Sequence, residues 1–549
     1  MYSDRENVNI LTSILIGHGI RHIVVCPGSR NSPLVHNFNE SPELECHPAT
    51  DERSAGFIAL GITIQTGIPA AVCVTSGSAL LNVLPAAAEA TLQGQGIIII
   101  SADRPSAWTG QLDGQTMEQK NAMGSFTAIS VSLPEPHDDT QRWECNRLAN
   151  EAILSVHSPA RPSVHINVPI SEPLFRYTTK ELPHERIVNS LFWSLDYVRE
   201  NVCREISESS RPMIIIGQTS DYAIPHEILE ELSEKITILT EPLSTSPSSR
   251  TPTDAMLARI ASHPDEYYPD TVIYMGGNTV SKRLRHFLRS INAFQMTVSP
   301  DGVLHDISQH TSLVISGDPG DVIADLNKSL AAPATEEATD FLKLWKTLKE
   351  RTIKAIDGFT PPFSQMLAVK LLEETAGKND TYFYANSSAV RLAALYARHH
   401  CRCCRGLNGI EGTLSAAVGT ALAKTACHDD TPVFCVIGDL SFFYDHNALW
   451  QNSLPENLRI LLLNNGGGGI FRSLKGLWES PAAENLIAAG HKLSAEWVCR
   501  QYGLAYMKAN DEKTLRDGLS ALRKGQMLLE VITDAETDQN TIENFYGNE

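Results

Sequence analysis

The sequence predicts an α/β protein built from three doubly wound parallel-sheet domains. Continuous Val- and Ile-rich runs, such as Ile97 to Ile100, alternate along the chain with apolar-periodic helical stretches. Strands buried on both faces of a parallel sheet have this pattern. Several of the runs end in Gly-containing turns, and 549 residues are enough for about three or four domains at ~150 residues each. Several successive αβ units in one chain are therefore expected.

The first αβ block extends from the start of the chain to about residue 174. A helix, a strand and a Pro-Gly turn open it, and a strand–turn–helix pattern then recurs. The expected elements are a helix at 8–16, a strand at 21–26, a strand and its turn at 70–77, a helix at 79–92 and a strand at 96–101. This block predicts an N-terminal domain at residues 1–178.

Two polar segments separate this block from two later ones. Residues 171–186 contain Pro, and residues 329–340 are rich in Ala, Pro, Thr and Glu, as linkers are. Strands are expected at 213–216, 271–275 and 312–316 in the middle block, and at 432–437, 458–463 and 527–532 in the last, which also has a helix at 412–424. The predicted domains are a central α/β domain at 187–330 and a C-terminal domain at 341–549. The middle block has no G-x-G-x-x-G after a strand, so we expect no nucleotide cofactor there.

Composition excludes some classes of partner. A net charge of −19 and a pI near 5.4 repel phosphate backbones, which argues against nucleic acid. The polar start of the chain lacks the features of a signal peptide, and no run approaches a membrane span of ~20 apolar residues. A cytoplasmic protein is expected, with its eleven cysteines reduced. The Cys-x-Cys-Cys run at 401–404 has no matching downstream pair, which disfavours a zinc site there.

Two polar clusters follow strands of the last block. Asp439 comes after the strand at 432–437, and Asn465 comes after the strand at 458–463, ahead of the glycine run Gly466 to Gly469. Carboxylate and amide oxygens suit Mg²⁺, and glycines allow backbone N–H groups to approach a diphosphate. The pattern resembles the Gly-Asp-Gly…Asn motif of thiamine-diphosphate enzymes. The alternative is that Asp439 caps a turn and the glycine run is a flexible loop.

A thiamine-diphosphate enzyme also needs a carboxylate against the N1′ atom of the aminopyrimidine ring. In the superfamily that glutamate lies in the first αβ block, and here Asp51-Glu52-Arg53 precedes a helix rich in small residues. The alternative is that Asp51 is an N-cap and Glu52 an ordinary first-turn acid.

The motifs become specific when they are taken together, because they follow one another in a fixed order across all three blocks. The series is Pro27-Gly28-Ser29-Arg30, Asp51-Glu52-Arg53, Thr75-Ser76-Gly77, Ala102-Asp103-Arg104-Pro105, Gln115, Ser281-Lys282-Arg283, Asn386-Ser387 with Arg391, Arg405-Gly406, Gly409-Ile410, Gly438-Asp439-Leu440-Ser441, Tyr444-Asp445, Asn464-Asn465 and Ile470-Phe471. Over essentially the whole chain it resembles the 2-succinyl-5-enolpyruvyl-6-hydroxy-3-cyclohexene-1-carboxylate synthases. Leu440, Gly114, Gly466 and Gly469 depart from the family's pattern.

The resemblance implies a thiamine-diphosphate-binding fold, with a pyrimidine-binding domain at 1–178 and a diphosphate- and Mg-binding domain at 341–549. It also implies a transferase of menaquinone biosynthesis. Such enzymes decarboxylate 2-oxoglutarate and add the succinyl carbanion equivalent to isochorismate, with thiamine diphosphate and Mg²⁺ or Mn²⁺. They place the site between subunits, which implies a homodimer or homotetramer. Two alternatives stay open: another thiamine-dependent 2-oxoacid decarboxylase or carboligase, and a non-catalytic homologue.

The same resemblance implies the site residues. Glu52 is the catalytic partner of N1′. The cofactor-binding residues are Glu52, Gln115, Ser387, Ile410, Asp439, Asn465 and Gly467, of which Asp439, Asn465 and Gly467 hold the metal. The substrate-binding residues are Ser29, Arg30, Arg104, Gln115, Lys282, Arg283, Ser387, Arg391, Arg405, Ile470, Phe471 and Leu474. Both substrates are dicarboxylates, and arginine is suited to bidentate carboxylate recognition.

Overall fold

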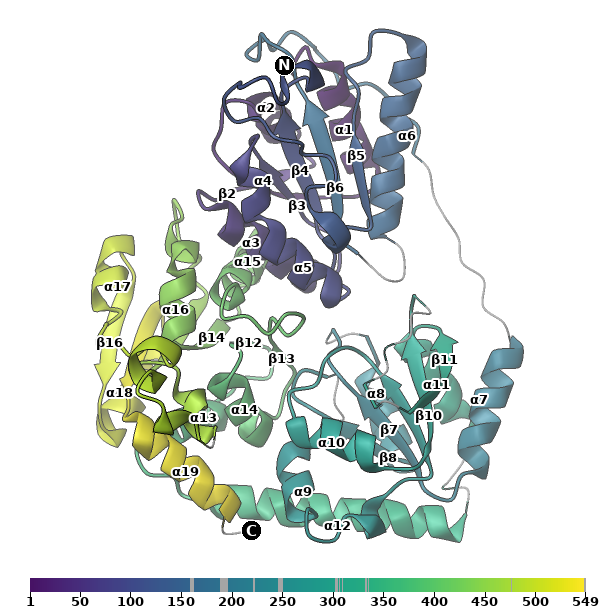
Figure 1. Cartoon of the computed structure of the whole chain (residues 1–549), viewed down its shortest axis with the longest axis vertical. Coiled ribbons are helices and arrows are strands. Elements are labelled where there is room, and N and C mark those ends of the chain that lie inside the picture. Colours follow the sequence, from purple (N-terminus) through teal and green to yellow (C-terminus); the bar gives the residue numbers. More distant parts are fainter. Residues whose placement is uncertain are drawn as a thin grey trace. The chain divides into compact units, whose positions relative to one another are not determined.

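The computed structural model describes residues 1–157, 162–187, 196–220, 223–244, 250–301, 305, 307–308, 310–330, 333, 335–474 and 476–547. The chain forms two compact units (Figure 1). Unit 1 consists of residues 1–192, 406–433 and 443–458, and unit 2 of residues 193–405, 434–442 and 459–549. The described residues contain three sheets, all of them parallel in the pairings observed.

Unit 1 contains the first sheet, with strand order β2-β1-β3-β4-β6-β5. The strands are β1 (His22–Val25), β2 (Glu45–Pro48), β3 (Ala71–Val74), β4 (Ile98–Asp103), β5 (Ile129–Ser132) and β6 (Val164–Pro169). The helices are α1 (Glu6–Gly17), α2 (Ser32–Glu40), α3 (Glu52–Thr66), α4 (Ser78–Asn82), α5 (Leu84–Leu92) and α6 (Asp139–Val156), with 3₁₀ turns η1 (Ser106–Trp108) and η2 (Gly124–Phe126).

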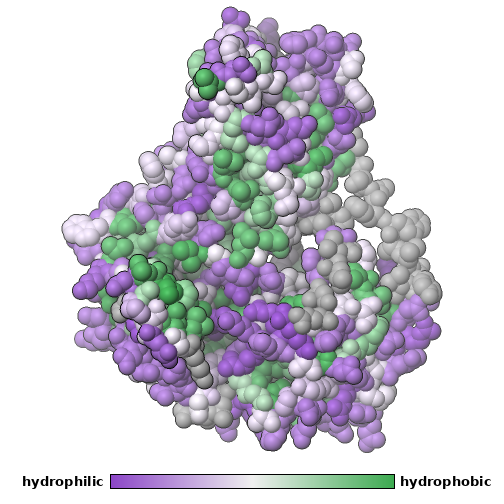
Figure 2. All heavy atoms as spheres, viewed as in Figure 1, coloured by the Kyte–Doolittle hydropathy of each residue, from purple (hydrophilic) through white to green (hydrophobic). Residues whose placement is uncertain are grey.

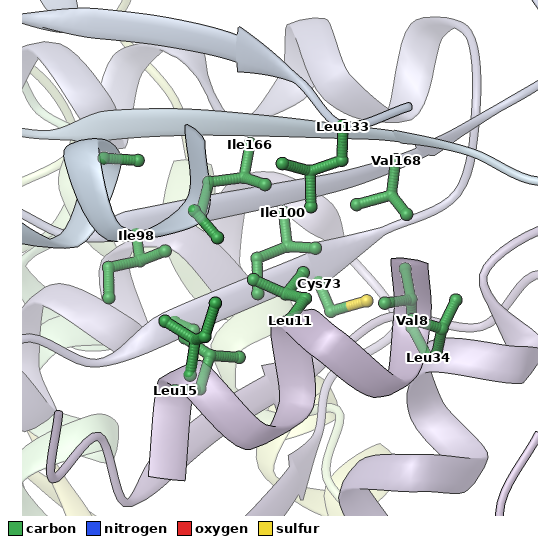
Figure 3. Packing of buried hydrophobic residues seen from close by; sticks show 14 of the residues in the cluster. Val8, Leu11, Leu15, Leu34, Cys73, Ile98, Ile100, Leu133, Ile166 and Val168 are labelled. Atoms are coloured by element: carbon green, nitrogen blue, oxygen red, sulfur yellow. The ribbon is translucent and has the colours of Figure 1, made fainter. Parts of the chain in front are cut away.

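One face of the first sheet packs against α1, α2 and α6. Figure 3 shows Leu11 and Leu15 of α1 lying over Ile98 and Ile100 of β4 in this core. All four are fully buried, and each such side chain stabilises the fold by about 1.5–3 kcal/mol. This core fixes the strands whose carboxyl ends carry the first set of motifs.

The second sheet lies in unit 2, with strand order β11-β10-β9-β7-β8. Its strands are β7 (Pro212–Ile216), β8 (Thr237–Thr240), β9 (Thr271–Met275), β10 (Phe294–Ser299) and β11 (Thr311–Ser316). The helices around it are α7 (Asp196–Glu208), α8 (His226–Ser233), α9 (Thr253–Arg259), α10 (Lys282–Ser290), α11 (Pro319–Ser329) and the long α12 (Glu336–Gly358), with the turn η3 (Asp265–Tyr267).

The third sheet has strand order β13-β12-β14-β15-β17-β16. Its strands are β12 (Thr381–Tyr384), β13 (Cys401–Arg402), β14 (Val433–Gly438), β15 (Leu458–Asn464), β16 (Ala505–Ala509) and β17 (Met527–Ile532). The helices are α13 (Gln365–Glu374), α14 (Ser388–Tyr396), α15 (Thr413–Ala426), α16 (Asp439–Asp445), α17 (Glu496–Tyr502), α18 (Glu512–Leu522) and α19 (Ala535–Gly547), and the short turns are η4 (His446–Leu449), η5 (Gly469–Ser473), η6 (Leu477–Glu479) and η7 (Ala483–Ile487).

Helix α15 belongs to unit 1, where it packs closely against α3. A Cβ atom on Gly61 would lie 2.0 Å from the carbonyl oxygen of Ala416, and one on Gly419 would lie 2.2 Å from that of Ile58. Only glycine fits at these two crossings. The contact fixes the direction of α3, whose first residue is Glu52.

The fold class is confirmed, and the expected strands lie within one or two residues of the observed ones. Two expectations differ. The helix expected at 79–92 is divided into α4 and α5, because Pro85 has no N–H to continue an α-helix and its ring clashes with the preceding turn. The second linker is shorter than 329–340, since α12 begins at Glu336 with the Thr335 side chain accepting a hydrogen bond from the Ala338 N–H. The domain boundaries 1–178, 187–330 and 341–549 stay a prediction.

No helix among the described residues is both long and apolar enough to span a bilayer. Figure 2 shows hydrophilic residues over much of the face that it views, with hydrophobic patches between them.

Candidate functional site

The predicted site residues of unit 2 gather at two points where the strand order of a sheet reverses. In the third sheet this point lies between β12 and β14, whose carboxyl ends lead to Ser387 and Asp439. In the second it lies between β7 and β9, and Lys282 and Arg283 open α10 after β9. Open α/β sheets bind their ligands at such points.

Asp439 is held by the loop that follows the neighbouring strand β15. Its Oδ2 accepts hydrogen bonds from three consecutive backbone N–H groups, of Asn465, Gly466 and Gly467, at 3.1, 2.8 and 3.0 Å. Burial raises the pKa of the Asp439 carboxyl, and the N–H donors and His491 lower it by less. His491 Nε2 lies 3.5 Å from Asp439 Oδ2. Successive N–H groups that converge on one anionic oxygen form a site that favours phosphate-like anions.

The glycine loop adopts conformations that other residues avoid. Gly466 has φ 81° and Gly467 has φ 153°, and a Cβ atom on Gly467 would lie 2.9 Å from the carbonyl oxygen of Ala488. The loop is tied down by the Gly468 N–H, which donates to the same oxygen at 2.7 Å. Hydrogen bonds and close backbone contacts therefore hold the glycine loop in this conformation.

Asn465 is oriented by a buried carboxylate that the motifs did not reveal. Its Nδ2 donates to Asp538 Oδ2 at 3.0 Å, and Asp538 also accepts from the Gln365 N–H and the Thr533 hydroxyl. Because a carboxylate accepts hydrogen bonds, the amide nitrogen faces Asp538 and the amide oxygen faces away from it. The Asn465 amide oxygen, the Asp439 carboxylate and the Gly467 carbonyl are all oxygen donors, the ligand type that a hard divalent cation prefers.

A cavity of about 610 Å³ adjoins the glycine loop in unit 2. Its volume lies in the usual range for small-molecule sites. Six predicted substrate residues line it, together with the predicted metal ligand Asn465: Lys282, Arg283, Arg391, Ile470, Phe471 and Leu474. Helix α19 adds five residues that no motif indicated, namely Ala535, Asp538, Gln539, Ile542 and Tyr546. The only sequence signal for them is that they follow the carboxyl end of β17.

Arg405 is a buried cation close to a second one. Its residue is 6% exposed, its Nη1 donates to Asn386 Oδ1 at 3.0 Å and its Nη2 to the Thr279 carbonyl oxygen at 3.3 Å. Its Nε is buried without a hydrogen-bond acceptor among the described residues. Burial lowers the pKa of Arg405, and Arg391 lowers it as well. A buried donor and two like charges favour an anionic ligand at this position.

Arg283 is held between an acid and an aromatic ring. Its Nη1 contacts Asp254 Oδ2 at 2.5 Å, and its guanidinium carbon lies 4.6 Å from the ring centroid of Tyr546. The Tyr546 hydroxyl donates to the same Asp254 oxygen at 3.0 Å. Asp254 and α19 therefore position this cation at the cavity wall.

Ser387 has a strained backbone. Its φ of 72° and ψ of −124° lie outside the regions that non-glycine residues favour, and such strain is concentrated at functional sites. It is the N-cap position of α14, next to Ser388, which lines the cavity.

In unit 1, Glu52 is the first residue of α3 and is partly buried. Asn82 Nδ2 donates to its Oε2 at 3.1 Å. Asp51 is indeed the N-cap, since its side chain accepts from the N–H groups of Arg53 and Ser54. Arg53 Nη2 donates to the Tyr444 carbonyl oxygen at 2.8 Å. Asp51 is therefore the N-cap and Glu52 is an acid of the first turn of α3, and a cofactor role for Glu52 stays a prediction.

The other unit 1 residues are divided between buried and exposed positions. Arg30 is buried and donates to the Ile170 carbonyl oxygen and to Glu172 Oε1, at 2.9 and 3.2 Å. Arg104 donates to the Gly114 carbonyl oxygen at 3.0 Å and pairs with Asp113. Ser29, Gln115 and Ile410 are exposed, and Gln115 has a positive φ of 56°.

Two protein-family models match the chain. Residues 6–124 match the N-terminal TPP binding domain of thiamine pyrophosphate enzymes, and residues 386–531 match their C-terminal TPP binding domain. The glycine loop and Asp439 lie within the second match, and Glu52 lies within the first.

Curated relatives match over the full length. Proteins named 2-succinyl-5-enolpyruvyl-6-hydroxy-3-cyclohexene-1-carboxylate synthase from Bacteroides fragilis and Phocaeicola vulgatus are 39% and 38% identical, covering 100% of this chain and 99% of their own. One of the same name from Flavobacterium johnsoniae is 35% identical, covering 95% of both chains.

A solved structure has the same fold. It is the X-ray structure of a protein from Mycobacterium smegmatis described as a thiamin diphosphate-dependent enzyme, with a TM-score of 0.74 at 16% identity, covering 97% of this chain and 99% of that one.

Proposed function

Since this chain belongs to the 2-succinyl-5-enolpyruvyl-6-hydroxy-3-cyclohexene-1-carboxylate synthase family, we propose that it decarboxylates 2-oxoglutarate and adds the succinyl unit to isochorismate in menaquinone biosynthesis. It is a thiamine-diphosphate-dependent transferase. Relatives of this name match the chain over its whole length. In this proposal the enzyme acts in the cytoplasm.

The observation that carries the substrate assignment is the concentration of cations around one cavity in an acidic chain. Lys282, Arg283 and Arg391 line the cavity. Arg405 is buried, and its Nε has no hydrogen-bond acceptor among the described residues. Its charge interacts with that of Arg391, which lowers the pKa of Arg405. A pyruvate-specific enzyme needs fewer cations than an enzyme of two dicarboxylates. The pocket therefore favours 2-oxoglutarate and isochorismate over a single monocarboxylate.

The cofactor supplies a carbon nucleophile at its thiazolium ring when bound. In this proposal Asp439, Asn465 and the Gly467 carbonyl hold Mg²⁺ or Mn²⁺, which neutralises the diphosphate charge. Asp538 keeps the Asn465 amide oxygen directed away from itself and so available to the metal. Glu52 would hold the N1′ atom of the aminopyrimidine, with Gln115, Ser387 and Ile410 also binding the cofactor.

The proposed assembly is a homodimer or homotetramer. Glu52 belongs to unit 1, and Asp439 and Asn465 belong to unit 2. In the thiamine-diphosphate superfamily the two halves of a cofactor site come from different subunits. Ser29, Arg30 and Arg104 of unit 1 would then join the unit 2 residues at one site.

The function is tested by incubating the holoenzyme with 2-oxoglutarate alone and then adding isochorismate, with product identified by mass spectrometry. We expect the succinylated cyclohexene product only when both are present. Pyruvate in place of 2-oxoglutarate should yield no product. Efficient turnover of pyruvate would instead support a general 2-oxoacid carboligase, and no binding of thiamine diphosphate in Mg²⁺ would identify a non-catalytic homologue.

The two substrates are expected to use different arginines. We predict that Arg391→Ala will slow CO₂ release from 2-oxoglutarate alone, because Arg391 and Arg405 face the carboxylate of that substrate. Arg30→Ala should leave CO₂ release intact and impair product formation with isochorismate, as should changes at Arg104 and Arg283. Removing the partner of a desolvated carboxylate costs about 2–5 kcal/mol, so each loss should exceed ~30-fold in kcat/KM.

Single-turnover measurements separate the two effects. Arg516→Ala is a matched control, because Arg516 is exposed on α18 and pairs with Glu512, and it should leave both steps unchanged. Equal effects of Arg391→Ala and Arg30→Ala on CO₂ release would refute the division between substrates without refuting the function.

A further inference from the structure

Three side chains with metal-ligating atoms lie together at one edge of the first sheet, on residues outside the cofactor and substrate motifs. They are His22 of β1 and Glu45 and His47 of β2, and their ligand atoms all lie within 4.8 Å of one another. We propose that they bind a divalent transition-metal cation of the zinc class, with water completing the coordination.

The distances match a tetrahedral centre. His22 Nδ1 lies 3.1 Å from His47 Nε2 and 3.7 Å from Glu45 Oε2. Ligand atoms about 2.0–2.1 Å from a tetrahedral zinc ion are about 3.3 Å from one another. Two of the three separations are therefore within about 0.4 Å of the tetrahedral value, and the third, between His47 and Glu45, is no more than 4.8 Å.

Strand register places the three on the same face. In the parallel β1–β2 pair, His22 lies opposite Glu45 and Val24 lies opposite His47. Because side chains alternate along a strand, Glu45 and His47 project from the same face as His22. Cys46 between them projects from the other face, where it packs against the core of α1, α2 and α6. The backbone alone thus assembles the group.

Both imidazoles are largely buried, since the His22 side chain is 12% exposed and His47 is 6% exposed. Glu45 supplies a negative charge, and because its side chain is 48% exposed, a solvent water can reach the fourth position.

The proposed ion has a structural role. Among the described residues, β2 is the edge strand of the sheet and pairs with β1 alone. An ion shared by β1 and β2 would fix this edge five residues before Glu52, the first residue of α3. Imidazole nitrogen favours Zn²⁺ or Co²⁺ over Mg²⁺, so this site and the oxygen-lined cofactor site should select different cations.

Zinc binding by the full-length chain tests the proposal. Protein freed of transition metals is kept reduced in saturating Mg²⁺ and titrated with Zn²⁺ against a chromophoric chelator. Its thermal unfolding is then followed with and without Zn²⁺. We expect one tight Zn²⁺ site per chain and a higher Tm in its presence, since a ligand that binds only the folded state stabilises it. Co²⁺ in the same site should give the intense visible absorption of tetrahedral coordination.

Three variants decide the result. His22→Gln should weaken Zn²⁺ binding at least ~100-fold, because even the outer partners of metal ligands contribute about 10–100-fold. Glu45→Gln should weaken it while leaving the fold intact, since Glu45 is exposed. Glu43→Gln, an exposed acid two residues earlier, should bind zinc as wild type does.

The controls distinguish this site from adventitious binding. Wild-type protein that shows neither a tight Zn²⁺ site nor a Zn²⁺-dependent Tm would overturn the proposal and leave an ordinary hydrogen-bonded histidine pair. Equal Zn²⁺ affinity in wild type, His22→Gln and Glu45→Gln would also overturn it, because the ion would then lie elsewhere. Far-UV circular dichroism confirms that each variant is folded.

Discussion

The Glu52→Gln variant is expected to exchange the C2 hydrogen of bound thiamine diphosphate for deuterium roughly 10²–10⁴-fold more slowly than wild type, the usual contribution of a positioned proton-transfer group. The carboxylate stabilises the protonated aminopyrimidine ring, and an amide cannot. Gln keeps the size of the side chain and can still accept from Asn82 Nδ2, which lies 3.1 Å from Glu52 Oε2. The local structure of α3 should therefore be unchanged.

The measurement isolates the proton transfer from substrate effects. The bound cofactor is incubated in D₂O without substrate, quenched, and examined by NMR. Cofactor affinity should change little, because it depends mainly on the diphosphate and the metal. Glu118→Gln changes an exposed acid of the same unit and should exchange at the wild-type rate. A Glu52→Gln protein that exchanges as fast as wild type would return Glu52 to the role of a first-turn helix acid.

The Asp439→Ala variant is expected to lose tight binding of thiamine diphosphate in Mg²⁺. Two effects act together: the metal loses a hard oxygen ligand, and the N–H groups of Asn465, Gly466 and Gly467 lose their shared acceptor. Loss of a charge partner at a desolvated site costs about 2–5 kcal/mol, which corresponds to at least ~30-fold in Kd.

Calorimetric titration with cofactor and Mg²⁺ checks this expectation, and far-UV circular dichroism checks the fold. Asp439→Asn separates the two effects, since it keeps an oxygen but removes the charge, and should bind more weakly than wild type and more tightly than Asp439→Ala. Asp517→Ala, at an exposed position on α18, is the control. Normal cofactor affinity in Asp439→Ala would show that the metal is held elsewhere.

Much of the fold could be predicted because its cause is local. Buried parallel strands must be apolar along their whole length, so Met527–Ile532 and Thr271–Met275 were predicted with the bounds that the structure has. Helix boundaries were less certain, because they depend on single backbone groups: Pro85 divides one expected helix, and the Thr335 cap starts α12 inside an expected linker.

The candidate site was predictable only where a residue forms part of a motif. Strand ends identify Asp439 and Asn465, since polar side chains directly after apolar strands collect at one edge of a parallel sheet. The basic residues Arg283 and Arg391 were assigned through the family resemblance, because an isolated arginine is most often a solvated surface cation.

The sequence by itself therefore determined the fold class, the family and the strand ends that carry the candidate cofactor groups. Only the tertiary structure decided which residues support them. Asp538 and Tyr546 reach the cavity because α19 packs beside it, and His22 meets His47 because two strands pair in one register. Contacts of this kind depend on packing between segments far apart in the chain, and no local pattern of residues encodes such a distance.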